Sequence, residues 1–155
     1  MLVVAFVKLD KHFIQQIHDA DGKIILAITG GGASSVTKLL AVPGASSTVL
    51  SAFIPYHDEE LATYLGGKPE TACSSRTARA MAMVAWQRAQ QLELEVPVFG
   101  VGCTAALATN RDRRGADRCF IAIQSVELTA EIAVIFDKSG RSREEEEHLC
   151  STLIL

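Results

Sequence analysis

The sequence predicts an α/β domain, a three-layer α/β/α sandwich around a mixed, mostly parallel sheet. Apolar runs of strand length, such as Lys23–Thr29 (KIILAIT), alternate with segments whose apolar residues recur at helical spacing. The last two expected strands follow one another without a helix between them, which is typical of a hairpin added to such a sheet. The 155 residues show no internal repeat and no linker. A chain of this length can bury its own core, so we expect a single domain over residues 1–155.

The first half of the chain is expected to alternate short helices with two strands. Asp10 caps the first helix, because an aspartate side chain satisfies free N–H groups of a first turn. Asp21-Gly22 then turns the chain into the first strand, and Pro43-Gly44 ends the second helix. The expected elements are a helix at 10–20, a strand at 23–29, a helix at 33–41, a strand at 48–56 and a helix at 58–65.

The second half begins with the longest helical pattern, which Ser74 or Ser75 caps and which ends near Leu92. Its alanines form one face, which indicates close packing on a sheet or another helix. A third strand at 96–103 is expected to end in a glycine-bearing turn, Gly100-Val101-Gly102. The remaining expected elements are a polar loop at 104–117, strands at 118–125 and 127–137, and a last helix capped by Ser139 or Ser142. The glutamates at 144–147 suit the positive end of that helix, and we assign them no chemistry.

Charge and cysteine content exclude several classes of protein. The net charge of −3 and the pI of about 5.8 predict no nucleic-acid partner. No apolar run reaches the roughly 18 residues of a membrane span, and the apolar segment Met1–Val7 lacks the features of a secretory signal. We therefore expect a cytoplasmic protein with no membrane partner. The four cysteines form no CxxC pair and the four histidines are scattered, so we expect no metal site.

The strongest local signal for a binding site is Thr29-Gly30-Gly31-Gly32, between an expected buried strand and an expected helix. Glycines at such a junction expose backbone N–H groups to an anion, and Ser34 and Ser35 can add hydroxyl donors. The run has neither the P-loop lysine nor GxGxxG spacing. A tight turn with no ligand is the alternative interpretation.

A second group of small residues, Gly102-Cys103-Thr104, is also expected at a strand end. Ligands of open α/β sheets bind beyond the carboxyl ends of strands, so Gly102 and Thr104 are candidate ligand-binding residues. Cys103 is a candidate nucleophile, because nearby helix-end N–H groups can favour a thiolate. The alternative for Cys103 is a buried core residue, since no histidine lies near it in sequence.

Two polar side chains outside the small-residue clusters are also candidates. Arg111 belongs to a basic run with Arg113, Arg114 and Arg118 and can bind a phosphate or carboxylate. A solvated loop is the alternative. Tyr56 ends an expected strand and can donate to a ligand or take part in catalysis; its alternative is an aromatic residue whose hydroxyl lies in water.

Five segments in a fixed order resemble the C-terminal domain of CinA proteins, the family of nicotinamide-nucleotide amidases. They are IILAITGGG, LLAVPGASSTVL, IPYHDEELATYLGG, CSSRTARAMA and FGVGCTAALAT, within a resemblance from about Ile17 to Asp137. The resemblance implies a three-layer α/β domain, usually oligomeric, that hydrolyses the carboxamide of nicotinamide mononucleotide to nicotinate mononucleotide and ammonia. It implies no metal and no organic cofactor. The VPGAS loop adds Ser46 to the candidate ligand-binding residues.

The chain departs from the family at the residues that carry the chemistry. The family's E-S-C/A-T-G-G motif, whose serine is the proposed nucleophile, places Ala27 at the serine when its last three residues match Thr29-Gly30-Gly31. The family's Y-S-N-E-x-K block begins at Tyr56 here and ends with Leu61 in place of lysine. Neither Ala27 nor Leu61 can attack an amide or accept a proton. The proline and later glycines of the family's G-I-A-G-P-G-G loop are also missing after Gly102.

Three functions therefore remain open. The first is a nucleotide- or anion-binding domain without the family's activity, whose ligand is a pyridine nucleotide or another small phosphate. The second is a divergent hydrolase that uses Cys103, Ser34 or Ser35. The third is a structural domain for oligomerisation, because the apolar end HLCSTLIL resembles an unfinished, truncated helix that packs on a partner subunit. A homo-oligomer is expected in each case.

Overall fold

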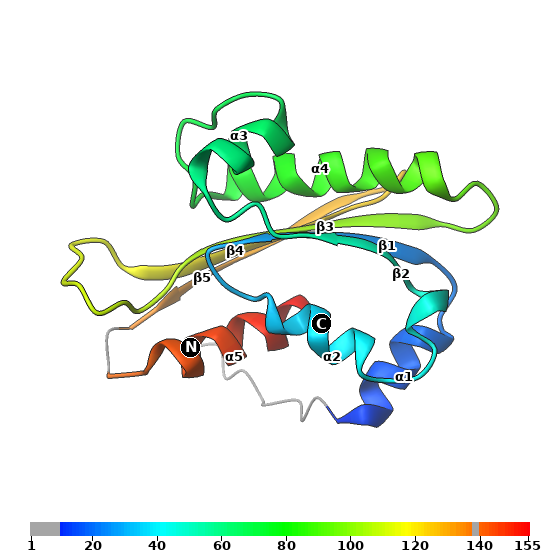
Figure 1. Ribbon diagram of the computed structural model, residues 1–155, viewed down its shortest axis with the longest axis horizontal. Helices are drawn as coiled ribbons and strands as arrows, with labels where there is room; N and C mark the ends of the chain where they lie inside the picture. Colours follow the sequence, from blue (N-terminus) through cyan, green and yellow to red (C-terminus); the bar gives the residue numbers. More distant parts are fainter. Residues whose placement is uncertain (1–9, 138–139) are drawn as a thin grey trace.

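The computed structural model describes residues 10–137 and 140–155, and it confirms the predicted α/β/α sandwich (Figure 1). Segment Met1–Val7 and the alternative cap Ser139 lie outside the described residues. The elements are α1 (Lys11–Asp19), β1 (Lys23–Thr29), α2 (Ser34–Leu40), the 3-10 helix η1 (Ala45–Ser47), β2 (Val49–Phe53), α3 (Asp58–Leu65), α4 (Ser75–Leu92), β3 (Val98–Ala106), β4 (Asp117–Gln124), β5 (Thr129–Phe136) and α5 (Arg143–Ile154).

The five strands form one sheet in the order β2-β1-β3-β4-β5. β1 pairs in parallel with β2 and β3, whereas β4 is antiparallel to both β3 and β5. Four strands therefore point in the same direction, as the sequence predicts. Helices α3 and α4 cover one face, and α1, α2 and α5 cover the other (Figure 1). The carboxyl ends of β1, β2 and β3 lie at a common edge, which we call the carboxyl edge.

The helices begin where their capping residues predict. The Asp10 carboxylate accepts a hydrogen bond from the backbone N–H of Phe13 at 3.0 Å, and the Ser74 hydroxyl accepts one from Thr77 at 3.1 Å. Ser142, one of the two predicted caps of the last helix, forms a capping box with Glu145. Such reciprocal bonds satisfy N–H groups that have no partner inside the helix.

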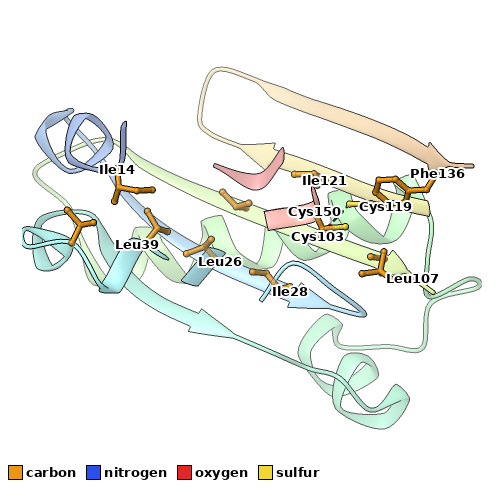
Figure 2. Close-up of a cluster of buried hydrophobic side chains, with 13 residues drawn as sticks. Ile14, Leu26, Ile28, Leu39, Cys103, Leu107, Cys119, Ile121, Phe136 and Cys150 are labelled. Carbon is orange, nitrogen blue, oxygen red and sulfur yellow. Dashed lines mark hydrogen bonds between the residues drawn. The ribbon is translucent and has the colours of Figure 1, made fainter. Parts of the chain in front are cut away.

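The main core lies between the sheet and the layer of α1, α2 and α5. Its centre is β1, whose last five residues are buried, and Figure 2 shows how side chains from several elements meet there. On the other face the alanines of α4 pack directly on the sheet, so the predicted face of small residues is confirmed.

The predicted turn at Gly100-Val101-Gly102 is wrong, because both glycines lie within β3 and not after it. A Cβ atom on Gly100 would lie 2.1 Å from the carbonyl oxygen of Ala82, and one on Gly102 would lie 2.3 Å from that of Ala78. The glycines thus allow α4 to approach the strand closely, which is a common reason for glycine inside a strand. β3 consequently extends to Ala106, beyond the predicted end at Cys103. β2 is shorter than predicted and ends at Phe53, two residues before Pro55.

Candidate functional site

The glycine segment at the carboxyl edge is a tight, closely packed turn. Gly30 and Gly32 have φ angles of 78° and 96°, which glycine adopts at little steric cost. A Cβ atom on Gly30 would lie 1.8 Å from the carbonyl oxygen of Ala105. Glycine at this position is therefore required by the backbone of the neighbouring strand β3.

A carboxylate of the same chain binds the N–H groups that the sequence assigned to an external anion. Glu147 on α5 accepts hydrogen bonds from the N–H groups of Gly32 at 2.5 Å and Ser34 at 3.0 Å. Arg143 donates to the carbonyl oxygen of Gly30 at 2.6 Å, and the hydroxyls of Ser34 and Ser151 are hydrogen-bonded. Helix α5 is thereby held on the glycine segment.

Sequence reasoning missed the role of Glu147. It stands in a run of four glutamates that resembles a solvated helix face, and it lies 113 residues from Ser34. No local spacing could have distinguished it from its neighbours. The N–H groups that the glycine pattern predicts for an anionic ligand are bonded instead to this carboxylate of the chain itself.

Several predicted site residues do converge behind this turn. Thr29 and Thr104 are register partners on β1 and β3. The Thr104 hydroxyl donates to the carbonyl oxygen of Ala72 at 2.8 Å, and the Ser35 hydroxyl donates to that of Gly32 at 2.7 Å. All three side chains are buried, and the hydroxyls of Thr104 and Ser35 hold the backbone in place.

Cys103 also lies behind the turn, but inside the core. Its exposed fraction is 0%, and its thiol lies 3.6 Å from the carbonyl oxygen of Gly31 and 3.8 Å from the thiol of Cys119. Figure 2 shows Cys103, Cys119 and Cys150 grouped among apolar side chains. The hydrogen bond with the Cys119 thiol, together with burial, raises the pKa of Cys150. The hydrogen bond with the Cys103 thiol raises the pKa of Cys119. The thiolate forms of Cys119 and Cys150 are therefore disfavoured.

Three predicted site residues lie apart from the glycine segment. Ser46 belongs to η1, which precedes β2 and so lies at the opposite edge of the sheet. Gly102 faces α4 through its backbone. Tyr56 follows β2 and is 66% exposed.

Arg111 lines a separate cavity of about 350 Å³ at the carboxyl edge, which we call the arginine cavity. It is formed by the loop after β3, the start of β4 and the first turns of α5. Its polar lining consists of Thr109, Arg111, Asp112, Arg113, Asp117, Asp137, Arg141 and Glu146, with Ala108 and Gly140 completing the wall.

Hydrogen bonds fix most of the charged groups of the arginine cavity. Arg113 pairs with Asp117 and also donates to the carbonyl oxygen of Ala106 at 3.0 Å. Arg141 pairs with Asp137 at 2.6 Å. Arg111, by contrast, is exposed and forms no ion pair with any residue in 10–137 or 140–155.

Glu146 closes the inner wall of the cavity. It is 1% exposed, and its carboxyl group accepts a hydrogen bond from the N–H of Ala108 at 2.6 Å. Burial raises the pKa of Glu146, and the nearby Asp117 carboxylate raises it further. The cavity therefore has a wall that favours a protonated carboxyl.

The positions at which the resembled family carries serine and lysine lie together in a hydrophobic cluster. Ala27 is 0% exposed and Leu61 is 2% exposed, and both pack with Tyr64 and Met81 beneath α3. The Tyr64 hydroxyl is buried with no hydrogen-bond partner among the described residues, and burial raises the pKa of Tyr64 to about 12. Neither the Ala27 methyl group nor the Leu61 side chain can act as a nucleophile or as a base.

Within the described residues, no helix is long and apolar enough to cross a membrane. The same part of the chain has no group of three or more histidine, cysteine, aspartate or glutamate side chains arranged to hold a metal ion.

Comparison with known proteins identifies the fold through structure and not through sequence. No protein-family model matches the chain, and no curated protein matches it in sequence. Among solved structures, the competence/damage inducible protein CihA from Agrobacterium tumefaciens is 20% identical with a TM-score of 0.70, over 93% of this chain and 88% of that one.

Two further solved structures agree with it. The competence or damage-inducible protein from Enterobacter asburiae is 17% identical with a TM-score of 0.72, over 93% of this chain and 89% of that one. The CinA superfamily protein from Klebsiella pneumoniae is 12% identical with a TM-score of 0.74, over 94% of this chain and 92% of that one. The chain therefore has the fold of CinA superfamily proteins across most of its length, as its motifs predict.

Proposed function

We propose that the chain is a divergent CinA-like domain that binds a small anionic ligand in the arginine cavity and does not hydrolyse nicotinamide mononucleotide. The observation that carries the proposal is that Arg111, which forms no ion pair among the described residues, lines a cavity at the carboxyl edge. Apolar residues at the positions matched to the family's serine and lysine argue against hydrolysis. Ligands of open α/β sheets bind at such an edge.

The environment of each candidate nucleophile argues against hydrolysis. Ala27 offers a methyl group, and Cys103 is enclosed in the core. Ser35 is fully buried and donates to a backbone carbonyl, and Ser34 is bound to Ser151. Covalent catalysis requires a nucleophile within reach of both substrate and base, and none of these residues meets that requirement.

The lining of the cavity indicates the class of ligand. Arg111 can bind a phosphate or carboxylate with two parallel N–H bonds. Asp112 and Asp137 contribute acceptors to the same lining, which suit the hydroxyl or amide N–H groups of a ligand. A pyridine nucleotide carries a phosphate and such donors together, so this class of ligand fits the mixed lining better than a bare anion.

A thermal-shift titration with pyridine nucleotides tests the binding proposal, because a ligand that binds the folded state raises its melting temperature. We expect a shift with the wild-type protein that Arg111→Ala abolishes. Arg114→Ala is the matched control, since Arg114 is an exposed arginine of the same loop outside the cavity lining. An equal shift in both variants, or no shift in the wild type, would contradict the proposal.

An ammonia assay with nicotinamide mononucleotide tests the catalytic half. We expect no release above that of a Ser34→Ala, Ser35→Ala, Cys103→Ala triple variant. Turnover that this variant loses would support the alternative of a divergent hydrolase.

A further inference from the structure

Strand β5 lies at an edge of the sheet and is paired with β4. Unlike the other strands, it carries large apolar side chains that are exposed on both faces. Ile132 and Ile135 are 49% and 73% exposed, and because their positions differ by an odd number they project to opposite faces. Helix α4 contacts the strand at Glu131, but these two isoleucines stay exposed among the described residues.

Among residues 10–137 and 140–155, the backbone of β5 also has no pairing partner on the side away from β4. The N–H of Ser125 donates to the carbonyl oxygen of Leu128 at 2.9 Å, which makes this the hydrogen-bonded pair that closes the β4–β5 hairpin. Hydrogen-bonded and non-bonded pairs alternate along antiparallel strands. The N–H and C=O groups of Thr129, Glu131, Ala133 and Ile135 therefore point away from β4, toward the free edge.

The strand lacks the features that protect edges from pairing. Residues 129–136 contain no proline and no lysine, and all eight pair with β4 without a bulge. The single charged residue, Glu131, is held on the chain's own α4 by Ser75 at 2.6 Å and Arg79 at 3.2 Å. Its carboxylate therefore does not block the free edge.

We propose that β5 pairs antiparallel with β5 of a second copy, so that two five-stranded sheets become one continuous sheet. A second copy fits because the strand is complementary to itself: each copy presents the same outward row of donors and acceptors. A two-fold axis near Ile132 or Ala133 keeps the two Glu131 carboxylates apart, whereas one at Glu131 would place like charges opposite each other. The exposed isoleucines of each copy then gain cross-strand neighbours on both faces of the joined sheet.

The test compares the mass in solution of the wild-type protein with that of two edge variants, by analytical ultracentrifugation over a range of concentrations. Ala133→Pro removes an outward N–H that β4 does not use, so β4 pairing should persist. Ile135→Lys places a charge at the interface. Each should raise the dimer dissociation constant about tenfold or more, which corresponds to about 1.4 kcal/mol. Leu40→Lys is the control, because Leu40 is 58% exposed and belongs to α2, which packs near β2 at the other edge of the sheet.

Hydrogen exchange gives a second measurement that does not depend on a variant. The amides of Glu131, Ala133 and Ile135 should be protected at high concentration and exchange faster on dilution. A monomeric wild-type protein would overturn the proposal. So would a dimer that both edge variants leave unchanged, or outward amides whose protection is independent of concentration, because another segment would then cover the edge.

Discussion

Ala27 and Leu61, which the motif match places at the family's serine and lysine, are both buried apolar residues. Both are in contact with one hydrophobic cluster beneath α3, and neither leaves a polar atom that needs a partner. The cluster nevertheless contains one polar group, the hydroxyl of Tyr64. Arg88 lies over the Tyr64 ring at 4.9 Å from its centroid and over Phe53 at 4.6 Å, so the arginine is held by the ring faces and not by the hydroxyl.

Tyr64→Phe should therefore leave the protein as stable as the wild type or more stable. A buried hydroxyl with no hydrogen bond costs about 1–3 kcal/mol, and phenylalanine keeps the ring that Arg88 contacts. Urea unfolding gives the free energy of unfolding for the variant and for the control Tyr56→Phe, whose ring is exposed. A loss of more than about 1 kcal/mol in Tyr64→Phe would show that the hydroxyl has a partner.

Gly102→Ala should destabilise the protein strongly, by about 2 kcal/mol or more, because the new methyl group meets backbone atoms that cannot rotate away. The added Cβ would lie 2.3 Å from the Ala78 carbonyl oxygen and 2.6 Å from the Ala82 nitrogen. Gly67→Ala is the matched control, since nothing lies within 4 Å of its added Cβ. Equal midpoints of urea unfolding for the two variants would contradict the close approach of α4 to β3.

At the scale of elements, α5 is joined to the rest of the molecule by polar contacts at its first two turns and by apolar packing at its end. Glu147 reaches the glycine segment, Arg143 reaches Gly30, and Glu146 reaches the loop after β3. The helix thereby connects the ends of β1 and β3. Its apolar end, predicted to pack on a partner subunit, contributes Leu153, Ile154 and Leu155 to the main core of its own chain.

Glu147→Ala should loosen α5 by leaving two backbone N–H groups without their charged acceptor. Hydrogen bonds to charged groups contribute about 1.5–3 kcal/mol, so we expect a loss of about that size in the free energy of unfolding. The amides of α5 should also exchange faster. Glu144→Ala is the control, because Glu144 is an exposed residue of the same first turn. The same result for both variants would show that the bonds of Glu147 carry no stability.

At the scale of the whole molecule, local patterns predict the layers and most elements, because they depend on neighbouring residues. The apolar run Lys23–Thr29 predicts β1, and Asp10, Ser74 and Ser142 predict where helices begin. Gly102 was assigned to a turn because a glycine inside a strand and a glycine in a turn look alike until the packing of α4 is known. Contacts between distant residues, such as Glu147 with Ser34, have no local pattern at all.

The arginine cavity brings three distant segments together, and its stability should depend on pH through Glu146. Because burial and Asp117 raise the pKa of Glu146 in the folded state above its ordinary value of 4.5, the folded protein holds a proton that the unfolded chain releases. The stability that the protonated Glu146 carboxyl contributes is fully present at pH values below its ordinary pKa. It is lost as the pH rises through the higher pKa of the folded state. The positive charge of Arg141 lowers the pKa of Glu146, and Arg113 pairs with the Asp117 carboxylate that raises it. Both arginines therefore influence the protonation of Glu146.

Glu146→Gln should remove this dependence, because the glutamine amide resembles the protonated carboxyl and can still accept from the N–H of Ala108. We expect the variant to match the wild type in acid and to become the more stable protein as the pH rises toward neutrality, measured by melting temperatures across that range. The adjacent Lys23 lowers the pKa of Glu93 to about 2, so protonation of Glu93 in acid reduces the stability of the folded protein. That effect is common to both proteins and cancels in their difference. Parallel pH profiles would show that Glu146 is ionised in the folded protein.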